Sequence, residues 1–380
     1  MDDRQRLEAF LARAEAAGGL DERRYQSLLA ELERPDVPTG YDEQGRLRIA
    51  MFDAKSYDVE SFAQANENRF AIHPLDTSLN ADTAKAAAGC TVVCIFVNDR
   101  CDREVVRVLA GLGIELIALR CAGFNNVDLA ACAEFGISVV RVPAYSPYAV
   151  AEHTVALMLM LNRRLHQAYL RNRAGYFVLE GLTGFDMRGK TVGVVGTGQI
   201  GRCVVDILCG FGCEVLAFDK FENAEIAAHE DVRYVPLEEL FASSDIITLH
   251  LPLFPETHYL INAQAIDRMR DGVMVINTSR GGLIDTQALI AGLKRGKIGF
   301  AGLDVYEEEA GIFFQDLSNK VLTDDVLARL MTFNNVVVTS HQAFLTREAL
   351  ANIARTTLDN VAEFAAGKRG AELSHAVLEN

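Results

Sequence analysis

The sequence has 380 residues, of which 50% are apolar, and its 52 acidic and 37 basic residues give a formal net charge of −15. A chain of this length is expected to form two packed domains, because one hydrophobic core rarely serves so many residues. The acidic balance repels polyphosphate and disfavours nucleic acid as a partner, so an anionic substrate would need a local cation.

The chain begins with a segment that we expect to be a helical N-terminal extension over residues 1–46. Two short helical patterns occupy residues 5–34, and Pro35, Pro38 and Gly40 end them. Mixed-charge helices of this kind are typical of a solvated packing or oligomer-contact element, and an assembly or regulatory role is the alternative. The acidic first residues lack the apolar core of a signal peptide, so the cytoplasm is the expected location.

The first half then alternates strand-like and helix-like segments, which is typical of a parallel sheet covered by helices. The predicted strands are Arg48–Phe52, Phe70–His73, Thr91–Phe96, Glu115–Leu119 and Ser138–Val142. Eight scattered cysteines lack the paired C-x-x-C spacing of a zinc or redox site. We interpret them as buried free thiols and expect no metal.

An amphipathic helix is predicted from about Ala149 to Gln167, as a bridge between the two halves. Its apolar run over residues 154–161 is far shorter than the roughly 20 residues of a membrane span, and charged residues flank the run. We therefore expect a buried helix and no membrane association.

The second half repeats the alternation, so each half has the length of a doubly wound unit. Its predicted strands are Thr191–Val195, Glu214–Phe218, Asp245–Leu249, Val273–Asn277, Phe300–Val305 and Val336–Thr339. The expected fold is thus α/β, with two doubly wound parallel-sheet domains of Rossmann-like or flavodoxin-like type and a cleft between them.

The segment Gly196-Thr197-Gly198-Gln199-Ile200-Gly201 directly follows an apolar strand pattern. In a dinucleotide site the first glycine permits a tight turn, the second lets the backbone approach the pyrophosphate, and the third lets the helix pack closely. The helix N-terminus supplies free N–H groups, and Gln199 and Ile200 would flank the pyrophosphate. Asp219, at the end of the next strand, would accept hydrogen bonds from the adenosine ribose and favour NAD over NADP. A glycine-rich turn without nucleotide is the alternative.

Three ionisable residues follow three successive strands of the second half: Arg280, Glu309 and His341. In open parallel sheets that edge is where ligands bind. A 2-oxo acid needs a bidentate cation for its carboxylate, which guanidinium provides, and an acid near neutrality for its carbonyl oxygen, which histidine provides. A carboxylate on the other ring nitrogen would fix the tautomer.

Each of these residues alone has a simpler interpretation. Taken alone, Arg280 would be interpreted as a surface residue and His341 as a structural one. Glu307–Glu309 would be interpreted as a solvated acidic face. Their joint placement favours a catalytic site. Asp304, also at a strand end, is predicted to bind the nicotinamide carboxamide or ribose, with a helix N-cap or loop residue as the alternative.

From about Leu47 onward, four segments resemble the signature blocks of the D-isomer-specific 2-hydroxyacid dehydrogenase family. These are the glycine-rich loop, Asn277–Gly281, Gly302–Glu307 and Ser340–Phe344. Within that family, Leu119–Asp128, Val142–Pro147 and Phe313–Asp316 most resemble the fermentative D-lactate dehydrogenases. The residues before the first strand are additional to the family pattern.

The resemblance implies further site residues and a domain division. It makes Arg280, Glu309 and His341 the catalytic trio. The substrate contacts that it implies are Ala122, Gly123, Tyr145, Phe96 and Phe344, and Thr278 joins the cofactor contacts. The expected domains are residues 47–147 with 345–380 for substrate, and residues 148–344 for NAD. The last helix, Arg347–Gly367, would return to the first domain, and the helix near Ala149 would contribute to a homodimer or homotetramer.

We therefore expect NADH-dependent reduction of pyruvate to D-lactate, reversibly, with His341 as general acid and base. The pocket volume is not readable from sequence, so a glyoxylate, hydroxypyruvate or bulkier 2-oxo acid reductase is the first alternative. A non-catalytic NAD-sensing interaction protein on the same scaffold is the second.

Overall fold

A computed structural model describes residues 40–309 and 311–378, and these residues form two compact units. Unit 1 takes in the described residues up to Pro143 and those from Ile353 onward, and unit 2 runs from Ala144 to Asn352. The two helices predicted within residues 5–34, and most of the predicted extension, lie outside the described residues. No helix in the described ranges is long and apolar enough to cross a membrane.

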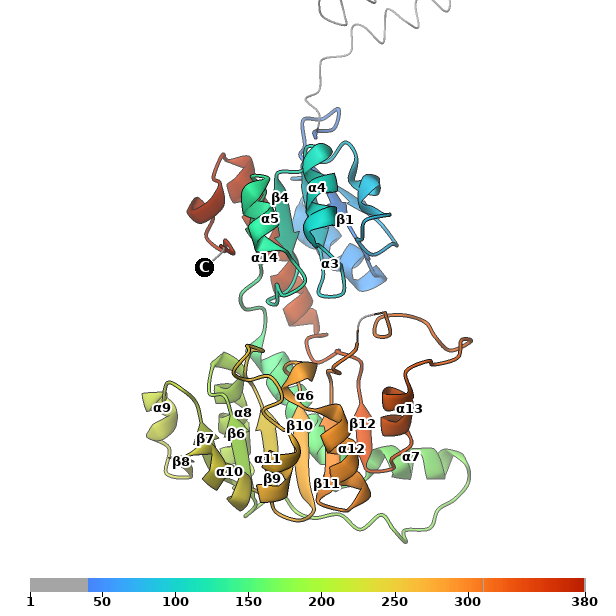
Figure 1. The fold of residues 1–380 in the computed structure, drawn as a ribbon, viewed down its shortest axis with the longest axis vertical. Coiled ribbons are helices and arrows are strands. Elements are labelled where there is room, and N and C mark those ends of the chain that lie inside the picture. The colour runs from blue at the N-terminus through green and yellow to red at the C-terminus, as the bar shows by residue number, and fades with distance from the viewer. Residues whose placement is uncertain (1–39, 310, 379–380) are drawn as a thin grey trace, which may run out of the picture. The chain divides into compact units, whose positions relative to one another are not determined.

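Unit 1 is built on a five-stranded parallel sheet with the order β2-β1-β3-β4-β5 (Figure 1). Its strands are β1 (Arg48–Met51), β2 (Ala71–Pro74), β3 (Val92–Ile95), β4 (Leu116–Leu119) and β5 (Ser138–Val140). Its helices include α3 (Ser56–Asn66), η1 (Ala84–Ala87), α4 (Arg103–Gly111), α5 (Leu129–Glu134) and η3 (Gly370–Glu372). This strand order is that of flavodoxin-like domains.

Unit 2 is built on a seven-stranded parallel sheet with the order β12-β11-β10-β9-β6-β7-β8. Its strands are β6 (Thr191–Val195), β7 (Glu214–Phe218), β8 (Val232–Tyr234), β9 (Ile246–Leu249), β10 (Val273–Asn277), β11 (Ile298–Leu303) and β12 (Val336–Val338). Counted from β6, the first six strands have the Rossmann order 3-2-1-4-5-6, with β12 added at the edge. The predicted α/β class with two doubly wound sheets is therefore confirmed.

Both faces of the unit 2 sheet are covered, which explains its near-continuous apolar strands. Val192 and Val194 of β6 face a core that includes Met158 and Leu208, while Val195 faces a second core around Leu240. The two cores use α6 (Pro147–Asn162) and α8 (Gln199–Gly210) on one face, and α10 (Leu237–Ser243), α11 (Ala263–Arg268), α12 (Thr286–Lys294) and α13 (Asp325–Met331) on the other. The remaining helices of this unit are α7 (Leu165–Arg173), the short α9 (Ala224–Ala227) and η2 (Gly281–Leu283).

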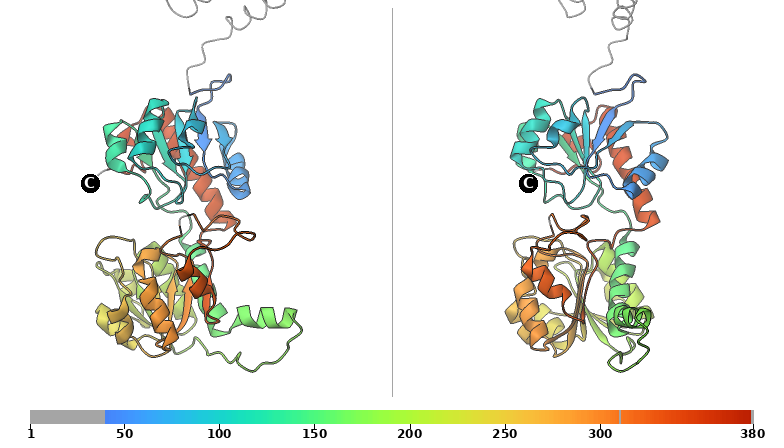
Figure 2. Two further views of the ribbon diagram at one scale, coloured as in Figure 1. Left: turned by 45° about the vertical axis from the view of Figure 1, so that its right-hand side comes forward. Right: turned by 90° about the vertical axis from the view of Figure 1, so that its right-hand side faces the viewer.

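The predicted helix from Ala149 to Gln167 is wrong in one respect, because two helices occupy that stretch. The helix α6 ends at Asn162, and Arg164 adopts a left-handed backbone with φ +52° before α7 begins. Figure 2 shows α7 and the segment after it as an arm projecting from the body of unit 2. The last helix, α14 (Arg347–Ala365), begins in unit 2, and its residues from Ile353 onward belong to unit 1.

Candidate active site

The carboxyl ends of β10, β11 and β12 lie side by side in unit 2. The strands are parallel neighbours, and the last residue of β11, Leu303, is in register with the last residues of β10 and β12. The three predicted catalytic residues follow these ends: Arg280 follows β10, Glu309 follows β11, and His341 follows β12. The three loops therefore lie at one edge of the sheet, where ligands of such folds bind.

His341 and Glu309 form a direct pair. The imidazole Nδ1 lies 2.9 Å from Oε1 of Glu309, and the other carboxylate oxygen accepts the N–H of Tyr306 at 3.2 Å. A carboxylate accepts only, so Nδ1 carries the hydrogen and Nε2 is left to face a ligand. The His341 side chain keeps 16% of its surface exposed, which leaves it within reach of one.

The backbone of the His341 loop is strained, since Ser340 and His341 have φ values of +53° and +58°. A fully buried carboxylate, Asp304, holds this loop. It accepts the Thr339 hydroxyl at 2.6 Å and the N–H groups of Gln342 at 2.9 Å and Ala343 at 3.0 Å. These bonds offset a conformation that non-glycine residues adopt only at a cost. The predicted contact of Asp304 with nicotinamide stays a prediction.

Arg280 follows a turn that Asn277 organises. The Asn277 amide accepts the N–H of Ser279 at 3.0 Å and donates to the Arg280 carbonyl at 2.8 Å. The half-buried guanidinium donates to the Ser279 carbonyl at 2.7 Å, and no carboxylate within the described residues lies within 4.0 Å of it. Its charge is therefore available to an external anion.

The loops of Arg280 and Glu309 touch through Gly281. A Cβ at Gly281 would lie 2.1 Å from the carbonyl carbon and oxygen of Tyr306, so the backbones are already in contact. The Glu307 carboxylate strengthens this junction by accepting the hydroxyls of Tyr259 and Thr286. A glycine is thus required where the two loops meet.

The glycine-rich loop has the geometry of a dinucleotide site. Gly196 has φ +97°, and a Cβ there would lie 2.4 Å from the His250 carbonyl oxygen. A Cβ at Gly201, in the first turn of α8, would lie 1.9 Å from the Gly196 carbonyl oxygen, whereas nothing lies within 4 Å of one at Gly198. Gly198 therefore opens onto free space at the helix N-terminus, next to Gln199, and a pyrophosphate fits there.

Asp219 follows β7 beside the same loop. One of its carboxylate oxygens accepts the N–H of Thr197 at 2.7 Å and its hydroxyl at 3.2 Å, and the other accepts the N–H of Phe221 at 3.1 Å. The Tyr234 hydroxyl, from β8, donates to the Thr197 hydroxyl oxygen at 2.8 Å. The carboxylate is half-buried, which suits hydrogen bonds to ribose hydroxyls.

Two other predicted cofactor contacts lie near this edge. Ile200 is half-buried in the first turn of α8. Thr278 is buried, and its hydroxyl oxygen lies 2.8 Å from that of Thr154, which itself donates to the Val150 carbonyl. Thr154 has one hydrogen, so Thr278 donates to it. Both residues stay predictions as cofactor contacts.

The predicted substrate residues fall into both units. In unit 2, the rings of Tyr145 and Phe344 meet edge to face with centroids 6.4 Å apart. In unit 1, the buried Phe96 ring lies 5.1 Å from the Arg120 guanidinium. The loop after β4 contains Ala122 and Gly123, whose carbonyls accept hydrogen bonds from Arg141 at 3.0 Å and from the Cys121 thiol at 3.2 Å. The roles of these residues toward a substrate stay predictions.

Sequence reasoning missed the supports of the site. Asp304 was predicted for a different contact, and His153, on α6, was not singled out at all. Its Nε2 lies 3.1 Å from the Thr339 hydroxyl oxygen and 3.5 Å from a carboxylate oxygen of Asp304. The available signal was an ionisable side chain on the edge of an otherwise apolar helix face. In the part of the chain that the structure describes, no group of three or more His, Cys, Asp or Glu side chains could hold a metal ion.

Comparison with known proteins agrees with this geometry. Residues 155–343 match the family described as D-isomer specific 2-hydroxyacid dehydrogenase, NAD binding domain. A D-lactate dehydrogenase of Escherichia coli is 52% identical over 323 residues, which are 85% of this chain and 98% of the relative.

Two solved structures are also similar. The apo-structure of D-lactate dehydrogenase from Escherichia coli has a TM-score of 0.79 at 50% identity, covering 87% of this chain and 100% of its own. A structure described as the pyruvate reductase of Chlamydomonas reinhardtii has a TM-score of 0.82 at 47% identity, covering 87% and 98%. The chain therefore belongs to the D-isomer specific 2-hydroxyacid dehydrogenases and is an NAD-dependent oxidoreductase.

Proposed function

We propose that this enzyme is a D-lactate dehydrogenase, which reduces pyruvate to D-lactate with NADH and runs the reverse reaction with NAD. The observation that carries the proposal is the His341–Glu309 pair at the same sheet edge as Arg280, a cation without a carboxylate partner in the described residues. The D-lactate dehydrogenase that is 52% identical supports the choice of substrate.

In this mechanism Arg280 binds the substrate carboxylate through two parallel N–H groups, a geometry that guanidinium matches and ammonium does not. His341, protonated on both nitrogens, donates its Nε2 proton to the carbonyl oxygen as that oxygen becomes an alkoxide. Glu309 keeps the ring oriented through its contact with Nδ1. A nicotinamide bound in unit 2 would supply the hydride for the carbonyl carbon.

Unit 2 would hold the cofactor, with the pyrophosphate over Gly198 and the adenosine ribose on Asp219. Thr278, Gln199 and Ile200 complete this proposed set. We propose residues 148–344 as the NAD-binding domain, and residues 47–147 with 345–380 as the substrate domain. In the substrate domain Ala122 and Gly123 would offer N–H groups to the carboxylate, and Phe96 would be an apolar wall.

A panel of 2-oxo acids tests the proposal. Purified enzyme is mixed with NADH and with pyruvate, glyoxylate, hydroxypyruvate or 2-oxoisocaproate, and oxidation is followed at 340 nm by the nicotinamide absorbance. The highest kcat/KM should belong to pyruvate, and chiral chromatography should identify the product as D-lactate. A higher kcat/KM for another acid would reassign the substrate, and an L product would overturn the stereochemistry.

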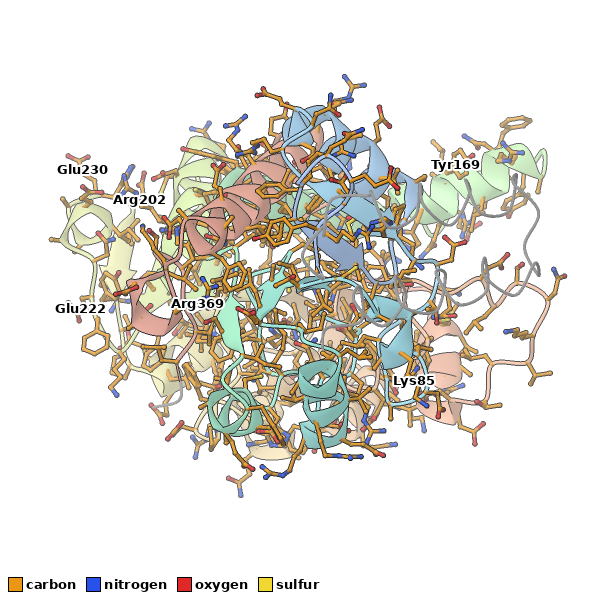
Figure 3. All side chains as sticks on the ribbon, turned by 90° about the horizontal axis from the view of Figure 1, so that it is seen from above. Lys85, Tyr169, Arg202, Glu222, Glu230 and Arg369 are labelled. Carbon is orange, nitrogen blue, oxygen red and sulfur yellow. The ribbon has the colours of Figure 1, made fainter. Side chains whose placement is uncertain are left out.

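We further propose a homodimer or homotetramer in the cytoplasm. The arm formed by α7 and the segment after it supports the assembly. Seven apolar side chains on this arm are at least 44% exposed, namely Leu165, Tyr169, Leu170, Tyr176, Phe177, Val178 and Leu179. Figure 3 labels Tyr169 on α7. Apolar groups concentrated on one surface element are typical of protein interfaces.

A further inference from the structure

The helix α6 packs tightly over β11, and this packing places His153 next to Asp304. A Cβ at Gly302 would lie 3.3 Å from the Leu157 Cβ and 3.2 Å from a Leu161 methyl group, so Gly302 faces the helix closely. Asp304, two residues further along the chain, points to the same face. His153 is one helical turn before Leu157, which brings it above Asp304 at the sheet edge.

A short hydrogen-bond chain connects this helix to the His341 loop. The Thr339 hydroxyl donates to Asp304 at 2.6 Å, so its oxygen can only accept from the His153 Nε2, which is 3.1 Å away. His153 therefore carries its hydrogen on Nε2. Burial lowers the pKa of His153 from its ordinary value, while the nearby Asp304 carboxylate opposes that shift. A neutral imidazole suffices for this bond.

Asp304 in turn forms hydrogen bonds with the backbone around the catalytic histidine. Its side chain accepts the N–H groups of Gln342 and Ala343, and its own carbonyl accepts the N–H of His341. The loop has two consecutive residues in the left-handed region, a conformation that persists only where surrounding contacts hold it. His153 is thus connected through two side chains to the position of the catalytic imidazole.

We propose that His153 is a positioning residue for the dehydrogenase reaction, which holds the Thr339–Asp304 support of the His341 loop from α6. The inference rests on the proposed role of His341. It predicts that removing the Nε2 donor lowers kcat, because the imidazole loses its alignment. It also predicts that NADH binding at the glycine-rich loop stays intact.

A pair of variants separates positioning from simple packing. His153→Leu removes the donor, and His153→Gln retains an N–H group at a similar reach. We expect kcat for pyruvate to fall about tenfold or more in His153→Leu, which corresponds to about 1.4 kcal/mol. His153→Gln should retain kcat within about threefold, and the dissociation constant for NADH, from fluorescence titration, should stay unchanged in both.

His166→Leu is the matched control. His166 lies on α7, and its Nε2 bonds the Asn334 carbonyl at 2.9 Å, away from the three catalytic loops. This variant loses a comparable bond from a neighbouring helix and should retain kcat. If His153→Leu fails to fold, Thr339→Val removes the hydroxyl that links His153 to Asp304 and should give the same loss.

Hydrogen exchange tests the inference without any substrate. The amides of Gln342 and Ala343 should exchange faster in His153→Leu than in the unsubstituted enzyme, and His153→Gln should restore their protection. Unchanged exchange in His153→Leu, or an equal loss of kcat in the Leu and Gln variants, would overturn the positioning role. If the unsubstituted enzyme reduces no 2-oxo acid, the proposed function fails, while the exchange experiment still decides the role of His153.

Discussion

Arg280 is the residue that we propose to bind the substrate carboxylate, and it offers a local cation in a protein whose net charge is −15. We predict that Arg280→Lys lowers kcat/KM for pyruvate at least tenfold, since the bidentate bond is worth roughly 1.5 to 3 kcal/mol. The midpoint of thermal unfolding should change little, because the guanidinium has no carboxylate partner in the described ranges. Steady-state kinetics measure kcat/KM, and calorimetry measures the midpoint of thermal unfolding. Full efficiency in the variant would remove Arg280 from the mechanism.

The sequence predicts the site residues that directly follow strands better than it predicts the residues that hold those site residues in place. Arg280 and His341 are recognisable because a strand ends three residues before each. The contacts of Asp304 are not recognisable, because its three hydrogen-bond donors come 35 to 39 residues later in the chain. His153 is even more distant in the sequence, since it lies 186 residues before Thr339. Only the packing of α6 on the sheet brings these groups together.

Among the elements, α6 depends on a glycine in β11. We predict that Gly302→Ala destabilises the enzyme by about 1 to 3 kcal/mol, because the new methyl group would lie 2.8 Å from an Ile276 methyl and 3.2 Å from Leu161. Gly210→Ala, at the end of α8, is the control. Nothing lies within 4 Å of its added Cβ, so it should be neutral or slightly stabilising. Denaturant unfolding compares them, and equal stability of the two variants would contradict the packing argument.

The C-terminal segment is fixed to α14 by Glu363. Its carboxylate accepts the hydroxyl of Ser374 at 2.6 Å and the N–H of Ser374 at 2.8 Å, and these bonds lower the pKa of Glu363 from 4.5 to about 2. A lowered carboxyl pKa stabilises the folded state above the unfolded value, and this contribution is lost as pH falls from about 4.5 through about 2.

We therefore predict that Glu363→Gln costs about 1 kcal/mol at pH 7, a value reduced for the partial exposure of the group. The difference in unfolding free energy between the two proteins should shrink as pH is lowered below about 4.5. Urea unfolding at pH 7, 4 and 3 measures it. A difference that is constant with pH would show that the bond does not depend on the carboxylate charge.

The elements that the sequence predicts best are the apolar strands of the buried sheets. The bounds of β6, β7 and β10 coincide with the predicted ones. β8 was missed, because Val232–Tyr234 is a three-residue edge strand with an exposed arginine in its centre, and so lacks an apolar run. The break between α6 and α7 was also missed. A left-handed residue is usually predicted from a glycine, but here that residue is Arg164, and the Arg163-Arg164 pair contains no glycine or proline.

For the whole molecule, the parallel sheet in each unit follows from the alternation of strands and helices along the chain, whereas the order of strands does not, because the two units share the alternation and differ in order. Parallel neighbours need a crossover helix, and right-handed crossovers leave few arrangements of such a sheet. The sequence therefore supports the fold class without any contact information. The exposed arm of unit 2 is different, because the sequence predicts one buried helix as far as Gln167, whereas α7, which begins at Leu165, has no buried residue.

That arm makes the state of assembly testable. Phe177 and Leu179 are 74% and 80% exposed, so replacing both with serine removes apolar surface without disturbing the core. We predict that the unsubstituted enzyme sediments at two or four times the mass of one chain. The double variant should shift toward the single-chain mass at micromolar concentration, because an interface loses affinity when central aromatic and aliphatic anchors are removed.

Met331→Ser is the control for this experiment, since Met331 is 65% exposed at the end of α13, outside the arm. It should leave the sedimenting mass unchanged. If the double variant retains the assembly while folding normally, the arm is not the interface. If the unsubstituted enzyme sediments as a single chain at every concentration, the exposed arm would have to serve a different partner, since nothing in its own unit buries these side chains.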